Sequence, residues 1–176
     1  MSALQPLETS LNDLFVKKAP PLPDNGKKAL VQYLPIINLV FGVISLLLAF
    51  SLYHTAHLFN GAAAYVNNLS QYYGGQKVVT DHFTFVVWLA IAMLAVEGLL
   101  YVLAYSPLKA HKKSGWDLTF YALLVNVAYG VIAAFTYYGG MGRLFGALLT
   151  SVIGGYLLFQ IRASYLKAPA ATTSKA

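Results

Sequence analysis

The chain has 176 residues, of which 58% are apolar and only 10% carry a charged side chain. An average soluble domain has about 25% charged residues, so this composition excludes an ordinary soluble globular protein. The sequence contains no cysteine, which excludes disulfides, thiolate metal sites and thiol catalysis.

The first expected element is a short amphipathic helix in a cytoplasmic N-terminal segment, residues 1–28. Apolar side chains recur there at helical spacing and polar ones take the other faces. We expect this helix to lie on the membrane surface with its apolar face down; the alternative is an unstructured tail with a chance pattern. The segment does not resemble a secretory signal. The apolar positions are Leu4, Leu7, Leu11, Leu14 and Phe15.

Four apolar runs follow, and each is close to the length of about 20 residues that a membrane-spanning helix needs. They form one predicted transmembrane domain, residues 29–166, with a cytoplasmic tail at 167–176. Glu97 is the only acidic residue within the runs. The predicted spans are 29–53, 83–108, 118–138 and 144–162.

The first of these helices has two expected irregularities. Proline lacks the backbone donor, so Pro35 is expected to kink or restart the helix. Apolar periodicity continues beyond Tyr53, and we expect the helix to extend outside the hydrocarbon or to lie along the outer interface. Gly74 and Gly75 are expected to end it.

The net charge of +6 has an uneven distribution that indicates topology rather than nucleic-acid binding. Ten of the basic residues lie at one end of the predicted spans, and only Lys77 and Arg143 lie at the other. This pattern places both termini in the cytoplasm, and the basic excess has a second possible role in attracting anionic lipid headgroups. The ten are Lys17, Lys18, Lys27, Lys28, Lys109, Lys112, Lys113, Arg162, Lys167 and Lys175.

Residues 30–45 and 118–133 resemble one another. Because the first and third spans run in the same direction, the resemblance predicts a duplicated helical hairpin whose halves are related by an axis along the membrane normal. The alternative is chance similarity, since apolar helices use few residue types. Identical residues include the pairs Leu30 and Leu118, Tyr33 and Tyr121, Asn38 and Asn126, and Gly42 and Gly130.

Three polar residues lie inside the apolar runs at similar depth. At about 1.5 Å per residue, Asn38, Asn126 and Glu97 lie roughly 12–16 Å inside the cytoplasmic boundary. A bare carboxylate there costs at least several kcal/mol, so we expect Glu97 to be protonated or hydrogen bonded, with the two amides as partners. An intramembrane acid indicates a functional site; the alternative is a neutral carboxyl group that joins helices.

Small residues form adjacent rows on the last span and include Ala147, Ser151, Gly154 and Gly155. Small residues four apart let helices approach closely in lipid. The face is therefore a candidate for helix packing, either against a neighbouring span of the same chain or in a dimer.

Histidine and aspartate residues occur at the outer ends of the first two spans. His54, His57, Asp81 and His82 are conceivable metal ligands, and haem ligation is also conceivable. Interfacial histidines without a ligand are the alternative.

The remaining motifs give no catalytic set. The turn that carries Lys109, His111, Lys112 and Lys113 is interpreted as solvated rather than as a phosphate site. Serines and threonines in the spans lack a nearby base. We therefore expect no cofactor and no enzymatic activity.

The stretches LNDLFVKKAPPLPDN, KKSGWDLTFYALLVNVAYGVI and YYGGMGRLFGALLTSVIGGYLLFQIR resemble small four-helix membrane proteins of reduced-genome bacteria. That family carries no assigned activity. The resemblance implies a protein of a bacterial cytoplasmic membrane and nothing more about function.

Together these patterns predict an all-α, multi-pass protein of the cytoplasmic (inner) membrane, with four transmembrane helices in two hairpins. The leading hypothesis is a non-enzymatic accessory or scaffold subunit, or a self-associating structural component. Its expected partners are membrane lipids and either copies of itself or a larger membrane complex, with no nucleic acid. The alternative is a small proton or cation channel or carrier that uses Glu97 beside Asn38 and Asn126. A metal or redox protein that uses the histidines is a third class.

Overall fold

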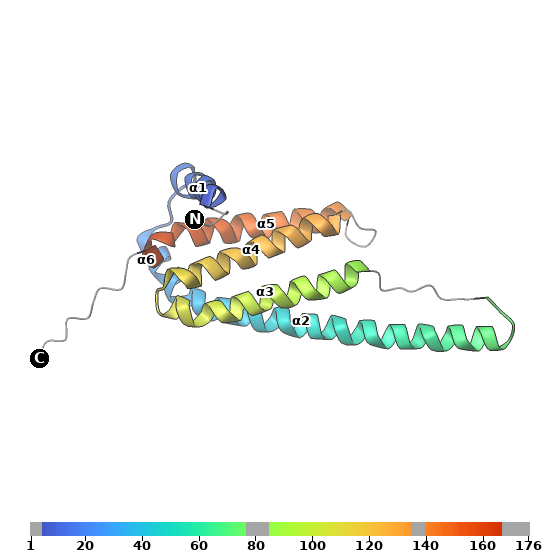
Figure 1. The fold of residues 1–176 in the computed structure, drawn as a ribbon. Helices are drawn as coiled ribbons and strands as arrows, with labels where there is room; N and C mark the ends of the chain where they lie inside the picture. Colours follow the sequence, from blue (N-terminus) through green and yellow to red (C-terminus); the bar gives the residue numbers. More distant parts are fainter. Residues whose placement is uncertain (1–4, 77–84, 135–139, 167–176) are drawn as a thin grey trace, which may run out of the picture.

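The computed structural model describes residues 5–76, 85–134 and 140–166, and every regular element within these ranges is helical. This confirms the predicted all-α class. Four long helices make up most of the molecule, and three short ones lie together at one end of it (Figure 1). The elements are α1 (Gln5–Asn12), η1 (Asp13–Lys18), α2 (Asp24–Tyr72), α3 (Phe85–Lys109), α4 (Lys113–Ala134), α5 (Gly140–Gln160) and α6 (Arg162–Leu166).

Three helices are long and apolar enough to cross a membrane, namely α2, α3 and α4. A shorter apolar stretch, Leu144–Gln160, lies in α5. The structure therefore supports an integral membrane protein, whereas the fourth span, the internal repeat and the orientation stay predictions. Residues 83–84 and 135–138 of the predicted spans lie outside the described residues.

Helix α2 contains Pro35 and continues through it as one helix, so of the two predicted outcomes the restart does not occur, and the kink stays a prediction. Proline leaves the carbonyl oxygen four residues earlier without its helical donor. That carbonyl belongs to Val31, and the hydroxyl of Tyr165 donates to it with an oxygen–oxygen distance of 3.5 Å. A side chain from α6 thus replaces the missing backbone donor.

Helix α2 is also much longer than a single membrane crossing. Its 49 residues extend about 73 Å at 1.5 Å per residue, against about 30 Å of hydrocarbon. The helix ends just before Gly74, whose φ of 78° is accessible to glycine without strain. Its predicted continuation beyond Tyr53 and its end at the glycine pair are confirmed.

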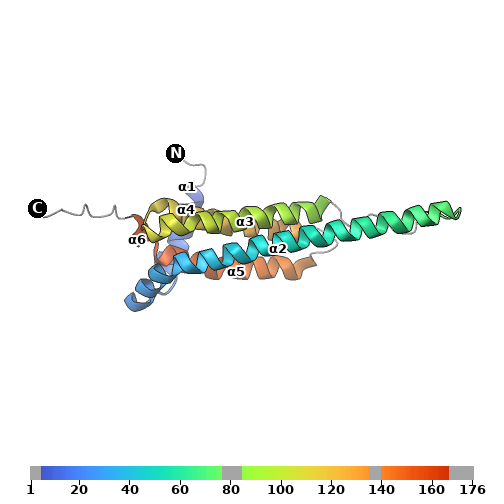
Figure 2. The same cartoon turned by 90° about the horizontal axis from the view of Figure 1, so that it is seen from below.

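The four long helices pack in chain order, α2 on α3, α3 on α4, and α4 on α5. Within the described residues, α2 and α5 are not among the helix pairs that pack closely along their lengths. Figure 2 shows the same helices from below, with α2 extending far beyond the others. The two end helices of the row therefore leave a space between them, described in the next subsection.

A close helix crossing joins α2 to α3 through two glycines. A Cβ atom added to Gly42 would lie 2.9 Å from the carbonyl oxygen of Gly98, and one added to Gly98 would lie 3.0 Å from the carbonyl oxygen of Gly42. Only residues without a Cβ permit such an approach. Gly42 therefore packs against α3, whereas Asn38, one turn earlier, contacts α4.

The hydrophobic core lies at one end of the molecule, where α5 and α6 meet the start of α4. Trp116 is fully buried and donates from Nε1 to the carbonyl oxygen of Leu158 at 2.9 Å. Its ring meets Phe159 edge to face, with centroids 5.1 Å apart. Along the rest of the helices many large apolar side chains are exposed, as expected where the surrounding solvent is lipid.

The N-terminal segment is held against this end by side chains of α5. Gln160 donates from Nε2 to the carbonyl oxygen of Phe15 at 2.7 Å and accepts from the backbone of Leu22 at 3.3 Å. The ring of Phe15 is buried and lies over Gly155. The N-terminal segment, which was expected to lie on the membrane surface, therefore contacts the helix bundle through its second half. Leu14, one of its predicted apolar positions, is nevertheless exposed.

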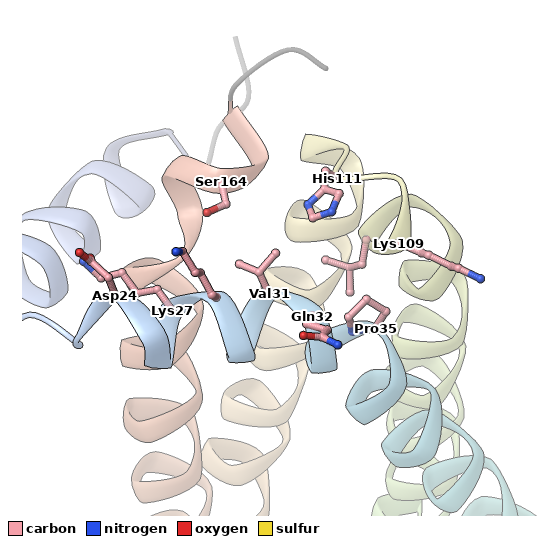
Figure 3. A pocket seen from close by; sticks show the side chains of 10 residues that line it. Asp24, Lys27, Val31, Gln32, Pro35, Lys109, His111 and Ser164 are labelled. Carbon is pink, nitrogen blue, oxygen red and sulfur yellow. The ribbon is translucent and has the colours of Figure 1, made fainter. Parts of the chain in front are cut away.

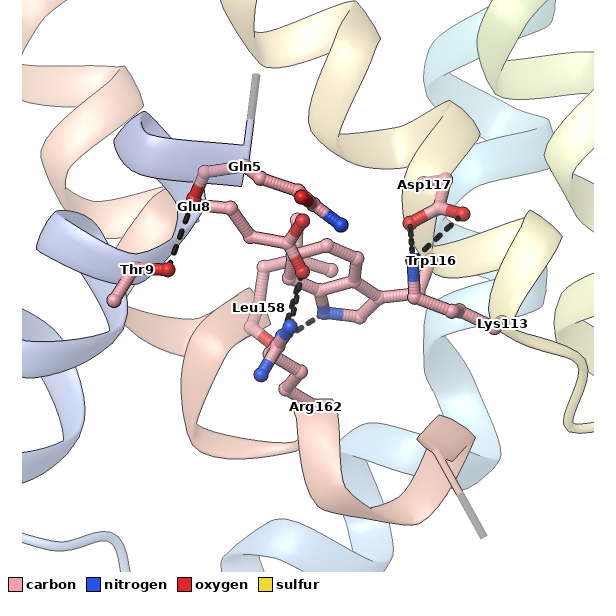
Figure 4. A network of polar contacts seen from close by, with 8 residues as sticks. All are labelled: Gln5, Glu8, Thr9, Lys113, Trp116, Asp117, Leu158 and Arg162. Carbon is pink, nitrogen blue, oxygen red and sulfur yellow. Dashed lines mark hydrogen bonds and ion pairs between the residues drawn. The ribbon is translucent and has the colours of Figure 1, made fainter. Parts of the chain in front are cut away.

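A polar cluster reinforces this attachment (Figure 4). Glu8 of α1 forms an ion pair with Arg162 of α6, whose guanidinium lies 5.4 Å from the centroid of the Trp116 ring. Both charged side chains are largely buried. Charge pairing thus joins the first and last helices of the described chain.

Candidate functional site

A cavity of about 540 Å³ lies between α2 and α5, with α3 and α4 also contributing to its lining. Half of its lining residues are leucine, isoleucine or phenylalanine. Its polar groups come from all four long helices, so the fold rather than a single motif assembles them. The polar lining residues are Asn38, Ser45, Glu97, Tyr101, Thr119, Asn126 and Thr150.

Glu97 of α3 and Asn126 of α4 lie next to each other in the lining of this cavity. The amide Nδ2 of Asn126 donates to Oε1 of Glu97, with an N–O distance of 3.4 Å. The other amide atom, Oδ1, is buried and has no hydrogen-bond partner. Such an orphaned acceptor costs about 1–3 kcal/mol in a dry interior. Of the two polar atoms of the Asn126 amide, only Nδ2 therefore has a hydrogen-bond partner in this chain.

Asn38 of α2 is buried and bonds to a different residue. Its Nδ2 donates to Oγ1 of Thr119 in α4 at 2.6 Å, and that hydroxyl donates to the carbonyl oxygen of Gly115 at 3.0 Å. This chain of hydrogen bonds links α2 to α4 across the row of helices. It leaves the side chain of Asn38 fixed at the wall of the cavity.

The three residues singled out by the sequence thus line one cavity but do not form one network. Glu97 and Asn126 are hydrogen bonded, and Asn38 has its own partner. Sequence reasoning missed Thr119 and Tyr101. Helical spacing could have indicated both residues. Tyr101 lies four residues after Glu97 and Thr119 lies seven before Asn126, so each shares a helix face with a predicted residue.

The small-residue face of α5 is covered by parts of the same chain. A Cβ added to Gly154 would lie 3.1 Å from the Leu123 side chain, and one added to Gly155 would lie 3.2 Å from the Phe15 ring. The hydroxyl of Ser151 is buried without a partner. Ala147 lines a smaller cavity next to Asn126.

The histidine candidates are only partly described. His54 and His57 are exposed on α2, and their rings stack on Phe50 and Tyr53 with centroid distances of 6.5 and 6.3 Å. Asp81 and His82 lie outside the described residues. Within the described ranges no group of three or more histidine, cysteine or acidic residues is placed to hold a metal. The metal hypothesis stays a prediction.

The chemistry available in the cavity between α2 and α5 is therefore hydrogen bonding and proton or cation binding at one carboxyl group. Its volume exceeds that of several water molecules, each of which takes about 30 Å³ in the liquid. Within the described residues the cavity holds neither a nucleophile with an adjacent base nor a metal-binding group. No protein-family model, curated protein or solved structure matches the chain.

Proposed function

We propose that this chain is a non-enzymatic, multi-pass protein of a bacterial cytoplasmic membrane that acts as an accessory or scaffold subunit. Its proposed task is to receive a transmembrane helix of another subunit, or of a second copy, in the cavity between α2 and α5. One observation carries the proposal: Asn126, whose buried amide oxygen Oδ1 has no hydrogen-bond partner, lines an open and largely apolar cavity between two helices that, within the described residues, do not pack closely against each other.

The lipid that surrounds a membrane protein supports this proposal. Lipid offers no hydrogen bonds, so a polar group inside the bilayer is satisfied by protein or by trapped water. Polar side chains accordingly join transmembrane helices, each contributing about 0.6 kcal/mol and up to about 1.7 kcal/mol. An incoming helix with a donor side chain satisfies Asn126, and its apolar flanks fit the aliphatic rim. Ile37 and Ile153 lie on that rim and are exposed.

The proposed topology has four spans in two hairpins, with both termini in the cytoplasm. The three membrane-length helices and the shorter apolar stretch of α5 support it. The ends that carry most basic residues, at the start of α2, the α3–α4 turn and α6, lie at one end of the bundle (Figure 1). That distribution agrees with the positive-inside pattern.

Photocrosslinking from single cysteines in native membranes tests the docking site directly, because the chain has no cysteine of its own. A thiol-attached benzophenone at Ile153→Cys reports on the cavity rim. The same probe at Leu103→Cys, an exposed position on α3 outside the cavity lining, is the matched control. The proposal expects protein adducts from position 153 and only lipid adducts from position 103. Lipid adducts alone from both positions would contradict it.

A second candidate function uses the same cavity. Among the residues that the structure describes, Glu97 is the only carboxyl group in its lining, which favours a small proton or cation channel or carrier acting with Asn38 and Asn126. In proteoliposomes this function predicts a flux that Glu97→Gln abolishes, since glutamine keeps the shape but cannot ionise. Equal flux through the mutant and the parent protein would eliminate it. Four helices alone rarely enclose a pore, so this function also requires an oligomer.

A further inference from the structure

A second cavity, of about 660 Å³, opens at the end of the molecule where α2 begins. Figure 3 shows its lining from three segments that are distant in the sequence: the first turns of α2, the α3–α4 turn and α6. His111, Val31 and Ser164 face the same space in this view. The basic lining residues are Lys27, Lys28, Lys109 and His111, and the acidic one is Asp24.

The positive charge of this cavity is not balanced by the nearby carboxylates. Among the described residues, the other acidic side chains at this end of the molecule are each paired elsewhere. These pairs are Glu8 with Arg162, Asp13 with Lys17, and Asp117 with Lys113.

Lys27 and Lys28 have no ion-pair partner within the described part of the chain. The ammonium group of Lys109 lies 6.0 Å from the centroid of the Tyr105 ring, and Figure 3 shows its side chain directed away from the cavity centre. Its stem is long and flexible enough to turn toward a bound anion. The cavity therefore has several basic groups against one carboxylate.

We propose that this cavity binds a phosphate group, and that the phosphate is the headgroup of an anionic membrane lipid. Lysine ammonium groups are strong partners for phosphate, and basic pockets at the cytoplasmic ends of transmembrane helices bind anionic headgroups. Gln32 and Ser164 add neutral donors to the lining. Free phosphate shares the same chemistry and is the other source to be distinguished.

The apolar part of the lining favours the lipid over the free ion. Val31, Pro35 and Leu108 form a wall beside the basic groups, and a lipid glycerol and its first acyl carbons fit such a wall. Burial raises the pKa of Tyr165, which stacks on His111, to about 12. The tyrosine hydroxyl therefore stays neutral at physiological pH and adds no negative charge beside the cavity.

A titration of the purified full chain in a neutral detergent tests the site. Short-chain phosphatidylglycerol is the anionic probe, phosphatidylcholine of the same chain length is the zwitterionic probe, and inorganic phosphate is the competitor. Thermal unfolding midpoints report binding, because a ligand of the folded state stabilises it. The proposal expects saturable stabilisation by phosphatidylglycerol and much weaker stabilisation by phosphatidylcholine.

The variant Lys27→Gln/Lys28→Gln removes two lining charges. The control Lys18→Gln/Lys112→Gln removes two exposed charges outside the cavity. The proposal expects the apparent Kd for phosphatidylglycerol to rise at least about tenfold in the first variant and less than about twofold in the control. An equal loss in both variants, or equal binding of the two lipids, would overturn it, because either result indicates diffuse charge or acyl-chain binding.

The competition experiment separates the two sources of phosphate. Displacement of phosphatidylglycerol only at far higher concentrations of inorganic phosphate supports the lipid headgroup. Displacement at equal concentrations overturns the lipid assignment and identifies free phosphate as the ligand. Lys18, Lys28 and Lys112 are exposed and Lys27 is half-buried, so an unchanged midpoint without ligand serves as the check on folding.

Discussion

Tyr165 and Val31 are joined by a hydrogen bond from the tyrosine hydroxyl to the one carbonyl of α2 that Pro35 leaves without its helical donor. The distance of 3.5 Å is long, so the bond is weak. We predict that Tyr165→Phe lowers the free energy of unfolding by about 0.5 kcal/mol. In a Pro35→Ala background the new backbone N–H supplies the donor, and the same substitution is expected to cost almost nothing. An equal cost in both backgrounds, measured by unfolding in mixed micelles, would contradict this role.

The crossing of α2 and α3 gives a sharper stability prediction. A Cβ at Gly42 would lie 2.9 Å from two backbone atoms, the Gly98 oxygen and the Val102 nitrogen, neither of which can rotate away. We expect Gly42→Ala to destabilise the fold by about 1–3 kcal/mol through overpacking.

The matched control for Gly42 is Gly61 on the same helix, which has nothing within 4 Å of an added Cβ. Gly61→Ala is expected to be neutral or to stabilise the helix by up to about 1 kcal/mol, because alanine has the higher helix propensity. If both variants change the unfolding free energy in the same direction, the close approach is not what constrains position 42.

The pair of Glu97 and Asn126 predicts non-additive substitutions. Glu97→Leu removes the acceptor of the Asn126 amide and leaves that group buried without a partner, at an expected cost of about 1–2 kcal/mol. Glu97→Gln retains a carbonyl acceptor and is expected to cost less. The double variant Glu97→Leu/Asn126→Leu removes both polar groups and should be more stable than the sum of the single changes. Strict additivity in a double-mutant cycle would show that the two side chains do not interact.

Attachment of the N-terminal segment depends on Gln160. Gln160→Leu removes the hydrogen bonds to Phe15 and Leu22, each of which contributes about 0.5–1.5 kcal/mol. We expect amide hydrogen exchange in residues 5–18 to accelerate about tenfold or more, while exchange in α3 and α4 stays unchanged. The exposed Gln71→Leu is the control. Unchanged exchange in the first variant would mean that Phe15 and the Glu8–Arg162 pair suffice to hold the segment.

A substitution on the small-residue face of α5 tests whether that face packs within the chain or between chains. Gly155→Leu places a side chain where the Phe15 ring lies. We therefore expect it to release the N-terminal segment, detected by faster proteolysis near Lys17 and Lys18, rather than to separate subunits. Loss of an oligomer without faster proteolysis would show that this face is an intermolecular contact.

The positions of the long helices, and the depth of residues along them, could be predicted from the sequence. Contacts between segments that are distant in the sequence could not. Apolar runs with at most one charged residue predicted α2, α3 and α4, and depth along the helices placed Glu97 and Asn126 at one level. The donor that meets the Val31 carbonyl left free by Pro35 was not predictable, because it is a hydroxyl group from α6.

The two cavities also differ in how far the sequence could predict them. Three of the seven polar lining residues of the first cavity, Asn38, Glu97 and Asn126, were predicted because each interrupts an apolar run. The basic cavity was missed, since Lys109 and His111 read alone are a solvated turn. Only the fold brings Lys27 and Lys28 beside them. Likewise, the burial of Phe15 depends on the glycine at position 155, which no local pattern connects to it.

Native mass spectrometry of the protein, gently extracted from its own membrane, tests the central claim that the cavity between α2 and α5 receives another helix. The comparison uses Ile153→Trp, which places a bulky ring at the cavity rim, and Leu103→Trp, an exposed α3 position outside it, as the control. We predict a complex for the parent protein and for Leu103→Trp, and a monomer for Ile153→Trp. A monomeric parent protein, or a complex that survives Ile153→Trp, would contradict the account.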